Sequence, residues 1–165
     1  MTEGKRYCLD TSGLSNPLDL MPESKAIYQP IWSHIKTLIE SGVFAVNAEI
    51  YDELCRLPGD IGECIKANKD KMLLEVGEDW DWSTYLSIFE DWRVKHKGVI
   101  SEYNGNRKGT VGVNDVSIVA LGKCLNLPVV SMESSSYQPS ATKVRIPALC
   151  HLEHVDHKTF NDLLP

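Results

Sequence analysis

The sequence predicts an α/β fold with a central parallel sheet of four to five strands and helices on both faces. Short apolar runs alternate with amphipathic segments along the chain, and this alternation is typical of parallel strands joined by helices. The runs are almost wholly apolar rather than alternating, as expected for strands covered on both faces. With 165 residues, 42% of them hydrophobic, the chain is long enough to bury the core of one domain.

Three short apolar runs are the predicted strands: residues 7–9, 43–46 and 128–132. A weaker fourth strand is predicted over 152–156. The first run ends at Asp10 and is followed by a polar turn, Thr11-Ser12-Gly13. The first strand therefore presents a carboxylate at its C-terminal end.

Helices are predicted where apolar residues recur every three or four positions. Asn47, Ser83 and Asn114 are the predicted N-caps, because short polar side chains accept hydrogen bonds from the first turn of a helix. The predicted helices cover 30–41, 47–57, 59–77, 83–94, 114–125 and 159–164. Residues 98–112 and 134–140 are predicted loops.

The composition excludes several classes of protein. The chain has 23 acidic and 17 basic residues, a net charge of −6, whereas a general nucleic-acid coat protein is normally basic. No run of about 18 apolar residues could span a membrane, and the first apolar stretch is too short for a signal peptide. Five irregularly spaced cysteines are expected to be reduced core residues. We therefore expect a cytoplasmic protein without membrane association.

Four acidic residues have a topological reason to meet. Asp10 and Glu133 each follow a predicted strand, and Glu53 and Asp115 lie in helices that begin at the same edge of the sheet. Functional groups of parallel sheets gather beyond the carboxyl ends of the strands. Clustered carboxylates repel one another and need a divalent cation, and all-oxygen ligands suit Mg²⁺ or Mn²⁺. Glu49 is the alternative for the second position.

Each of these acids lies in a short motif. The motifs are Leu9-Asp10-Thr11-Ser12-Gly13-Leu14, Val46-Asn47-Ala48-Glu49-Ile50-Tyr51-Asp52-Glu53-Leu54, Asn114-Asp115-Val116-Ser117-Ile118-Val119-Ala120 and Val129-Val130-Ser131-Met132-Glu133. In type and order they resemble the motifs of PIN domains, the metal-dependent nuclease fold of many toxin–antitoxin ribonucleases. The chain is most similar to a branch with a helical insert, a Glu in the last motif and an Ile-Pro-x-x-Cys segment, here residues 146–150.

The resemblance implies a single three-layer PIN-like domain over 1–165, with the helical insert at about 59–112. It implies a metal-dependent endoribonuclease in which Asp10, Glu53, Asp115 and Glu133 hold Mg²⁺ or Mn²⁺ and catalyse phosphodiester hydrolysis. It also implies an RNA substrate, a homodimer and a cognate antitoxin. Two departures matter: Ser12 replaces a frequent Asn, which would weaken the orientation of Asp10, and Glu133 replaces an Asp.

Other functions remain open. The same fold could form a catalytically idle PIN-like module that binds RNA or a protein. Two further enzyme classes share the opening motif, but aspartic proteases are all-β and phosphatases of the haloacid dehalogenase type need an Asp where Ser12 stands.

Several other side chains have a structural and a functional interpretation. Substrate contacts could come from five basic residues that could equally be solvated: Arg93, Lys95, Lys97, Arg107 and Lys108. Trp80, Trp82 and Trp92 could stack on bases, but packing in a core or interface is the favoured interpretation. His151, His154 and His157 could bind zinc, although their spacing of three favours surface histidines.

Overall fold

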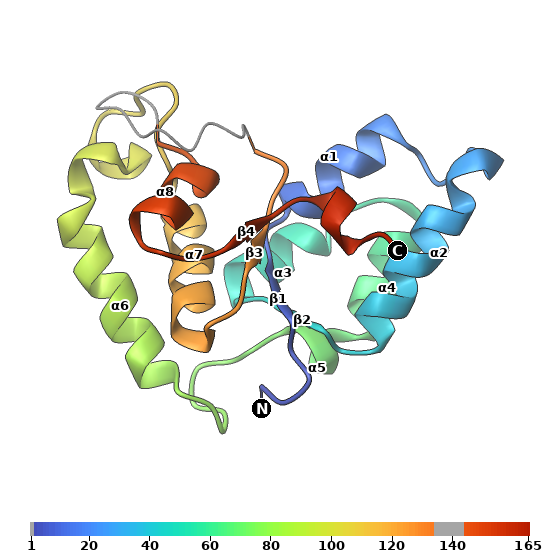
Figure 1. The fold of residues 1–165 in the computed structure, drawn as a ribbon, viewed down its shortest axis with the longest axis horizontal. Helices are drawn as coiled ribbons and strands as arrows, with labels where there is room; N and C mark the ends of the chain where they lie inside the picture. The colour runs from blue at the N-terminus through green and yellow to red at the C-terminus, as the bar shows by residue number, and fades with distance from the viewer. Residues whose placement is uncertain (1, 134–143) are drawn as a thin grey trace.

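The computed structural model describes residues 2–133 and 144–165. Its centre is a four-stranded, all-parallel sheet in the order β2-β1-β3-β4 (Figure 1). The strands are short: β1 is Tyr7–Leu9, β2 is Phe44–Ala45, β3 is Val129–Val130 and β4 is His157–Lys158. The predicted fold class is confirmed, because helices pack around a parallel sheet of the predicted size.

The strand β1 occupies the middle of the sheet. Cys8 pairs with Ala45 of β2 and with Val129 of β3. All three side chains are fully buried, as expected for parallel strands covered on both faces. The polar residues that follow β1 and β3 therefore emerge at the same edge of the sheet.

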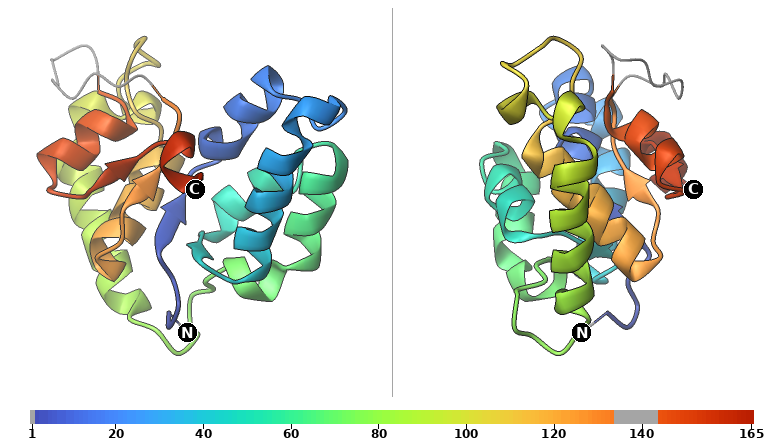
Figure 2. Two further views of the ribbon diagram at one scale, coloured as in Figure 1. Left: turned by 45° about the vertical axis from the view of Figure 1, so that its right-hand side comes forward. Right: turned by 90° about the vertical axis from the view of Figure 1, so that its left-hand side faces the viewer.

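Eight α-helices surround the strands in the described part of the chain. Figure 2 shows α6, α7 and α8 on one side of β1, with α1, α2 and α4 on the other. Their bounds are Ser12–Leu20 (α1), Gln29–Glu40 (α2), Ala48–Leu54 (α3), Gly59–Ala67 (α4), Lys69–Met72 (α5), Trp82–Lys95 (α6), Val113–Leu125 (α7) and Ile146–Leu152 (α8). Short 3-10 turns cover Ala26–Tyr28, Lys97–Val99, Ser101–Tyr103 and Phe160–Leu163. Among the described residues, none of these helices is both long and apolar enough to cross a membrane.

The predicted single helix over 59–77 is wrong. Asn68 separates α4 from α5, and its side-chain amide donates to the Cys64 carbonyl at 2.8 Å. Beyond α5 the chain runs beside β2, where Leu74 N–H donates to the Val46 carbonyl at 2.9 Å. The edge of the sheet thus offers backbone hydrogen bonds that a longer helix would leave unmade.

Two other elements differ from prediction. The polar turn after Asp10 continues directly into α1, with Pro17 inside the helix. The weak strand over 152–156 is wrong, because α8 runs to Leu152, His154 turns the chain with a φ of 57° and β4 begins at His157. The predicted loop over 134–140 lies outside the described residues.

The three predicted N-caps have different outcomes. Asn47 does cap α3 by accepting from Ile50 N–H at 3.1 Å. Asp81, not Ser83, caps α6 by accepting from Thr84 N–H. Asn114 already lies inside α7, which leaves its side chain free for another role.

Candidate functional site

Asp10 lies directly after β1 and is 4% exposed. One of its carboxylate oxygens, Oδ2, accepts from the Ser12 hydroxyl at 2.6 Å and from Ser12 N–H at 3.1 Å. The same hydroxyl accepts from Met132 N–H at 3.1 Å. Ser12 therefore orients Asp10 and ties it to the segment that follows β3.

Glu53 lies near the end of α3, and both of its oxygens are engaged. Thr11 donates its hydroxyl to Oε2 at 2.6 Å, and Asn114 donates its amide to Oε1 at 3.1 Å. Glu49, the alternative for this position, is exposed in the first turn of α3. The structure thus joins Glu53 to the neighbours of Asp10 and Asp115.

Asp115 and Glu133 each accept a backbone hydrogen bond at the start of a helix. Asp115 lies in the first turn of α7, where its Oδ2 accepts from Gly112 N–H at 3.3 Å. Glu133 follows β3 and accepts from Ile146 N–H, at the start of α8, at 2.9 Å. These bonds orient both carboxylates and satisfy helix-terminal N–H groups.

Burial and the charges of neighbouring acids perturb two of the four carboxylates, Asp10 and Asp115. Burial raises the pKa of Asp10 to about 6, and the charges of Glu133 and Glu53 also raise it, against the hydrogen bonds from Ser12. Burial likewise raises the pKa of Asp115 to about 8, with further contributions from Glu133, Asp10 and Glu53. Negative charge from four separate elements is therefore concentrated at one end of the sheet.

The carboxylates of this site are suitable ligands for a divalent cation, but they are not grouped into a closed binding site. Carboxylates are the ligands that Mg²⁺ and Mn²⁺ prefer, and a bound cation would offset both the burial of charge and the repulsion that raise the two pKa values. Within residues 2–133 and 144–165, however, no three His, Cys, Asp or Glu side chains are grouped closely enough to hold an ion between them. Mg²⁺ commonly binds through one or two carboxylates, with water and substrate phosphate completing its shell. The acids present fit that open arrangement rather than a closed cage.

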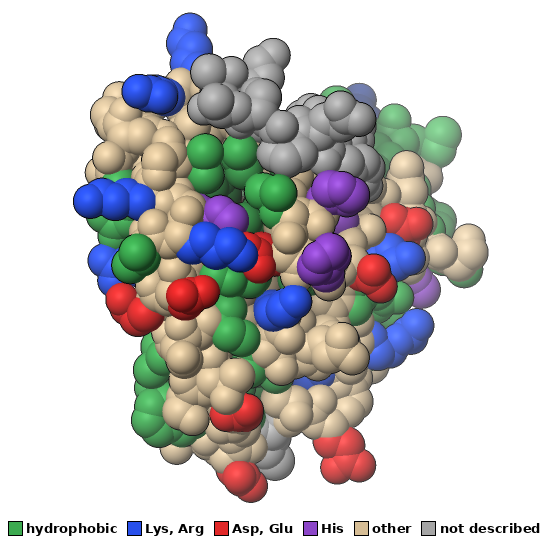
Figure 3. Space-filling view, turned by 60° about the vertical axis from the view of Figure 1, so that its left-hand side comes forward, with side chains coloured by type: hydrophobic (Ala, Val, Ile, Leu, Met, Phe, Trp, Pro, Cys, Tyr) green, Lys and Arg blue, Asp and Glu red, His purple; other side chains and the backbone are tan. Residues whose placement is uncertain are grey.

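Two of the predicted substrate contacts already have protein partners. Arg93 donates to the Tyr103 hydroxyl and pairs with Glu90 at 2.8 Å. Lys95 pairs at 2.7 Å with the buried carboxylate of Glu153. Figure 3 shows the Lys and Arg side chains of this face interspersed with acidic ones rather than forming a continuous basic surface. Lys97, Arg107 and Lys108 are exposed.

The aromatic and histidine clusters have structural partners. Trp92 and Tyr85 are buried, and the Trp80 ring lies 5.7 Å from the Tyr85 ring. His157 shares a hydrogen bond with the Ser131 hydroxyl at 2.7 Å, whereas His151 is exposed. The packing interpretation of the tryptophans is supported, and the described histidines form no zinc site.

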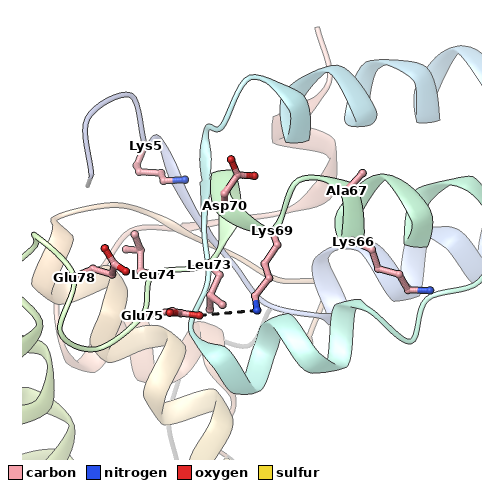
Figure 4. Close-up of a pocket in the computed structure, with 9 residues that line it drawn as sticks. All are labelled: Lys5, Lys66, Ala67, Lys69, Asp70, Leu73, Leu74, Glu75 and Glu78. Carbon is pink, nitrogen blue, oxygen red and sulfur yellow. Dashed lines mark ion pairs between the residues drawn. The ribbon is translucent and has the colours of Figure 1, made fainter.

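A cavity of about 460 Å³ lies at the other end of β1, beside Lys5 (Figure 4). Its charged groups are largely engaged with one another or with backbone. Lys5 donates to the Phe44 carbonyl at 2.6 Å and to the Lys71 carbonyl, and Lys69 pairs with Glu75 at 4.0 Å. This cavity is separate from the acids and offers no comparable set of functional groups.

Sequence reasoning missed two residues that hold the acids, Thr11 and Asn114. Each is the immediate neighbour of a candidate acid, which is the signal that could have drawn attention to them. The sequence places Thr11 in a polar turn and Asn114 at a predicted helix cap, and neither position indicates a contact with a distant acid. Their actual partner, Glu53, is distant in sequence from both.

Together the fold and the acids define an α/β protein with an acidic site at the carboxyl end of a parallel sheet. The chain belongs to the family described as "Domain of unknown function (DUF4411)", whose model matches residues 7–164. Comparison with curated proteins and with solved structures gave no match.

Proposed function

We propose that this protein is a PIN-like, metal-dependent endoribonuclease that hydrolyses RNA phosphodiester bonds as the toxin of a toxin–antitoxin pair. The main support is the concentration of four carboxylates from four elements, among which burial and the neighbouring charges raise the pKa of Asp10 and Asp115. Perturbed acids of this kind cluster at functional sites. The order of the motifs along the chain resembles that of PIN domains, and the parallel sheet is consistent with their fold.

Each acid has a separate part in the proposed reaction. A bound Mg²⁺ or Mn²⁺ would lower the pKa of a water molecule and stabilise charge on the scissile phosphate. Asp10 and Asp115 are the most perturbed acids and would hold the cation. Glu53, fixed at both oxygens, would orient the attacking water or complete the ligand set. Glu133, held by the start of α8, would bind through water or at a second position.

The proposal extends to the protein's partners. A homodimer, a cognate antitoxin that covers the acidic site and a cytoplasmic location all follow from the resemblance. The RNA contacts would fall to Lys97, Arg107 and Lys108, because Arg93 and Lys95 are already paired.

One observation favours a second candidate, a catalytically idle PIN-like module that binds RNA or a protein. In the described residues no three acidic, His or Cys side chains are grouped as a metal site, and every proposed ligand already accepts a hydrogen bond from the protein. An idle module would keep such a network for structural reasons alone.

The decisive experiment is RNA cleavage by purified protein with Mn²⁺ or Mg²⁺. We expect wild type to cleave, chelation to stop cleavage, and Asp115→Asn to reduce it by more than about 100-fold, because the cation would lose a main ligand. The matched control is Glu49→Gln, which removes an exposed acid of α3 and should keep full activity.

Folding is checked in parallel. Asp115→Asn should melt no lower than wild type, since it removes one of several mutually repelling charges. Cleavage that persists in Asp115→Asn would contradict the catalytic assignment. Failure of wild type to cut any RNA or DNA, together with tight binding of uncut RNA or of a partner protein, would favour the idle module.

A further inference from the structure

The carboxylate of Glu53 is clamped between two elements. Thr11, just before α1, donates its hydroxyl to Oε2 at a distance of 2.6 Å. Asn114, in the first turn of α7, donates its amide to Oε1 at a distance of 3.1 Å. A carboxylate that accepts a separate donor on each oxygen has a fixed plane as well as a fixed position. The orientation of Glu53 is therefore set by other elements and not by α3 alone.

The backbone of Asn114 is held by a second set of hydrogen bonds. The Ser117 hydroxyl donates to the Asn114 carbonyl at 2.7 Å and accepts from the Asn47 amide, also at 2.7 Å. Asn47 in turn accepts from Ile50 N–H and so caps α3. Asn47 and Ser117 are 5% and 4% exposed, so this polar network is shielded from water and is costly to break. It links the beginning of α3 to the beginning of α7.

We propose that Asn114 is a positioning residue, which orients Glu53 for the acidic site while adding no charge to it. This inference rests on the proposed function, because it assigns Glu53 a role in cation binding or catalysis. Each carboxylate oxygen has a second lone pair, so Glu53 can serve a cation or water while Asn114 and Thr11 hold it. Hydrogen-bond partners of this kind typically change metal affinity or activity by about 10-fold to 100-fold when removed.

The proposed role requires an amide at position 114. A carboxylate at position 114 would leave Oε1 of Glu53 without a donor. It would also add a fifth acid at a site where neighbouring carboxylates already help to raise the pKa of Asp10 and Asp115. Asn114→Asp, which is nearly isosteric, should therefore be more harmful than Asn114→Ala.

The experiment is a double-mutant cycle between Asn114→Ala and Glu53→Gln. Its two readouts are Mn²⁺ affinity by calorimetry and the separate kcat and KM for RNA cleavage. We expect Asn114→Ala to weaken Mn²⁺ binding or lower kcat by about 10-fold, with little change in KM. In the Glu53→Gln background the same substitution should have almost no further effect, because Asn114 acts through Glu53.

The other side of the clamp gives matched controls. Thr11→Val removes the hydroxyl at nearly constant volume and should resemble Asn114→Ala, whereas Thr11→Ser keeps the hydroxyl and should restore wild-type values. If Thr11 and Asn114 had only a structural role, their substitutions would lower thermal stability, and Thr11→Ser would not selectively restore Mn²⁺ affinity and kcat.

Three outcomes would overturn the inference. Wild-type affinity and kcat in Asn114→Ala would remove the positioning role and leave the nuclease proposal standing. Full additivity with Glu53→Gln would show that Asn114 acts elsewhere. If wild type itself neither binds Mn²⁺ nor cleaves RNA, the proposed function fails and this role fails with it.

Discussion

At the scale of single residues, the site is built at a cost to stability. Asp10 is almost completely buried, and its main hydrogen-bond donor is a single neighbouring serine. Those bonds do not offset burial and repulsion, so its pKa lies at about 6 rather than at the ordinary 3.8. Asp115 is perturbed in the same direction, to about 8. Proteins retain such unfavourable groups mainly where they serve a function.

These shifts predict how stability depends on pH. In both acids the pKa of the folded state lies above that of the unfolded state, so the folded protein binds protons more tightly. The resulting stability is fully present below about pH 3.8 and is lost as the pH rises through about 6 for Asp10 and about 8 for Asp115. For Asp10 the loss is on the order of 2–3 kcal/mol.

The measurement is urea unfolding between pH 4 and pH 9 without divalent cations. Asp10→Asn should flatten the curve and be more stable than wild type at pH 8. The prediction is wrong if wild type and Asp10→Asn lose stability in parallel across this range.

At the scale of elements, tight turns between short helices position the site. The chain leaves α3, which carries Glu53, and enters α4 within a few residues. Gly62 lies inside α4, and a Cβ added to it would lie 1.9 Å from the Leu57 carbonyl oxygen in the connecting segment. Only glycine allows α4 to lie so close to the segment that connects it to α3.

Gly62→Ala is therefore expected to be strongly destabilising, by about 2 kcal/mol or more, because the backbone rather than a flexible side chain must move. Gly98→Ala is the control, since no atom lies within 4 Å of a Cβ at that position, and it should change stability by less than about 0.5 kcal/mol. Thermal unfolding of both variants tests this comparison. Equal melting temperatures would show that the turn can relax.

At the scale of the whole molecule, the acidic site should couple cation binding to global stability. A ligand that binds only the folded state stabilises it in proportion to the logarithm of its concentration. At ten times the dissociation constant this amounts to about 1.4 kcal/mol, or roughly 3–6 °C for a chain of this size.

We therefore expect Mn²⁺ to raise the melting temperature of wild type, and expect the rise to shrink in Asp10→Asn. Differential scanning fluorimetry against a Mn²⁺ series measures both, and Ca²⁺ at equal ionic strength separates a site for small cations from general screening. If millimolar Mn²⁺ leaves the melting temperature of wild type unchanged, this result would count against the cation site.

The sequence by itself determined the fold class and three of the strands. Residues 7–9, 43–46 and 128–132 are mainly apolar and largely buried, and this pattern can be recognised in the sequence because parallel strands are covered on both faces. It also determined which acids follow the strands of a parallel sheet, since Asp10 and Glu133 lie next to β1 and β3 in the chain itself.

Only the tertiary structure decided what holds those acids and where the weaker elements end. The helix breaks at Asn68, and the chain beyond it makes backbone hydrogen bonds with Val46 at the edge of the sheet, which local periodicity does not indicate. The clamp on Glu53 joins Thr11 to a residue 42 positions away and Asn114 to the same residue 61 positions away. Local patterns report on backbone preference and burial, whereas partnerships between polar side chains exist only after distant segments have packed.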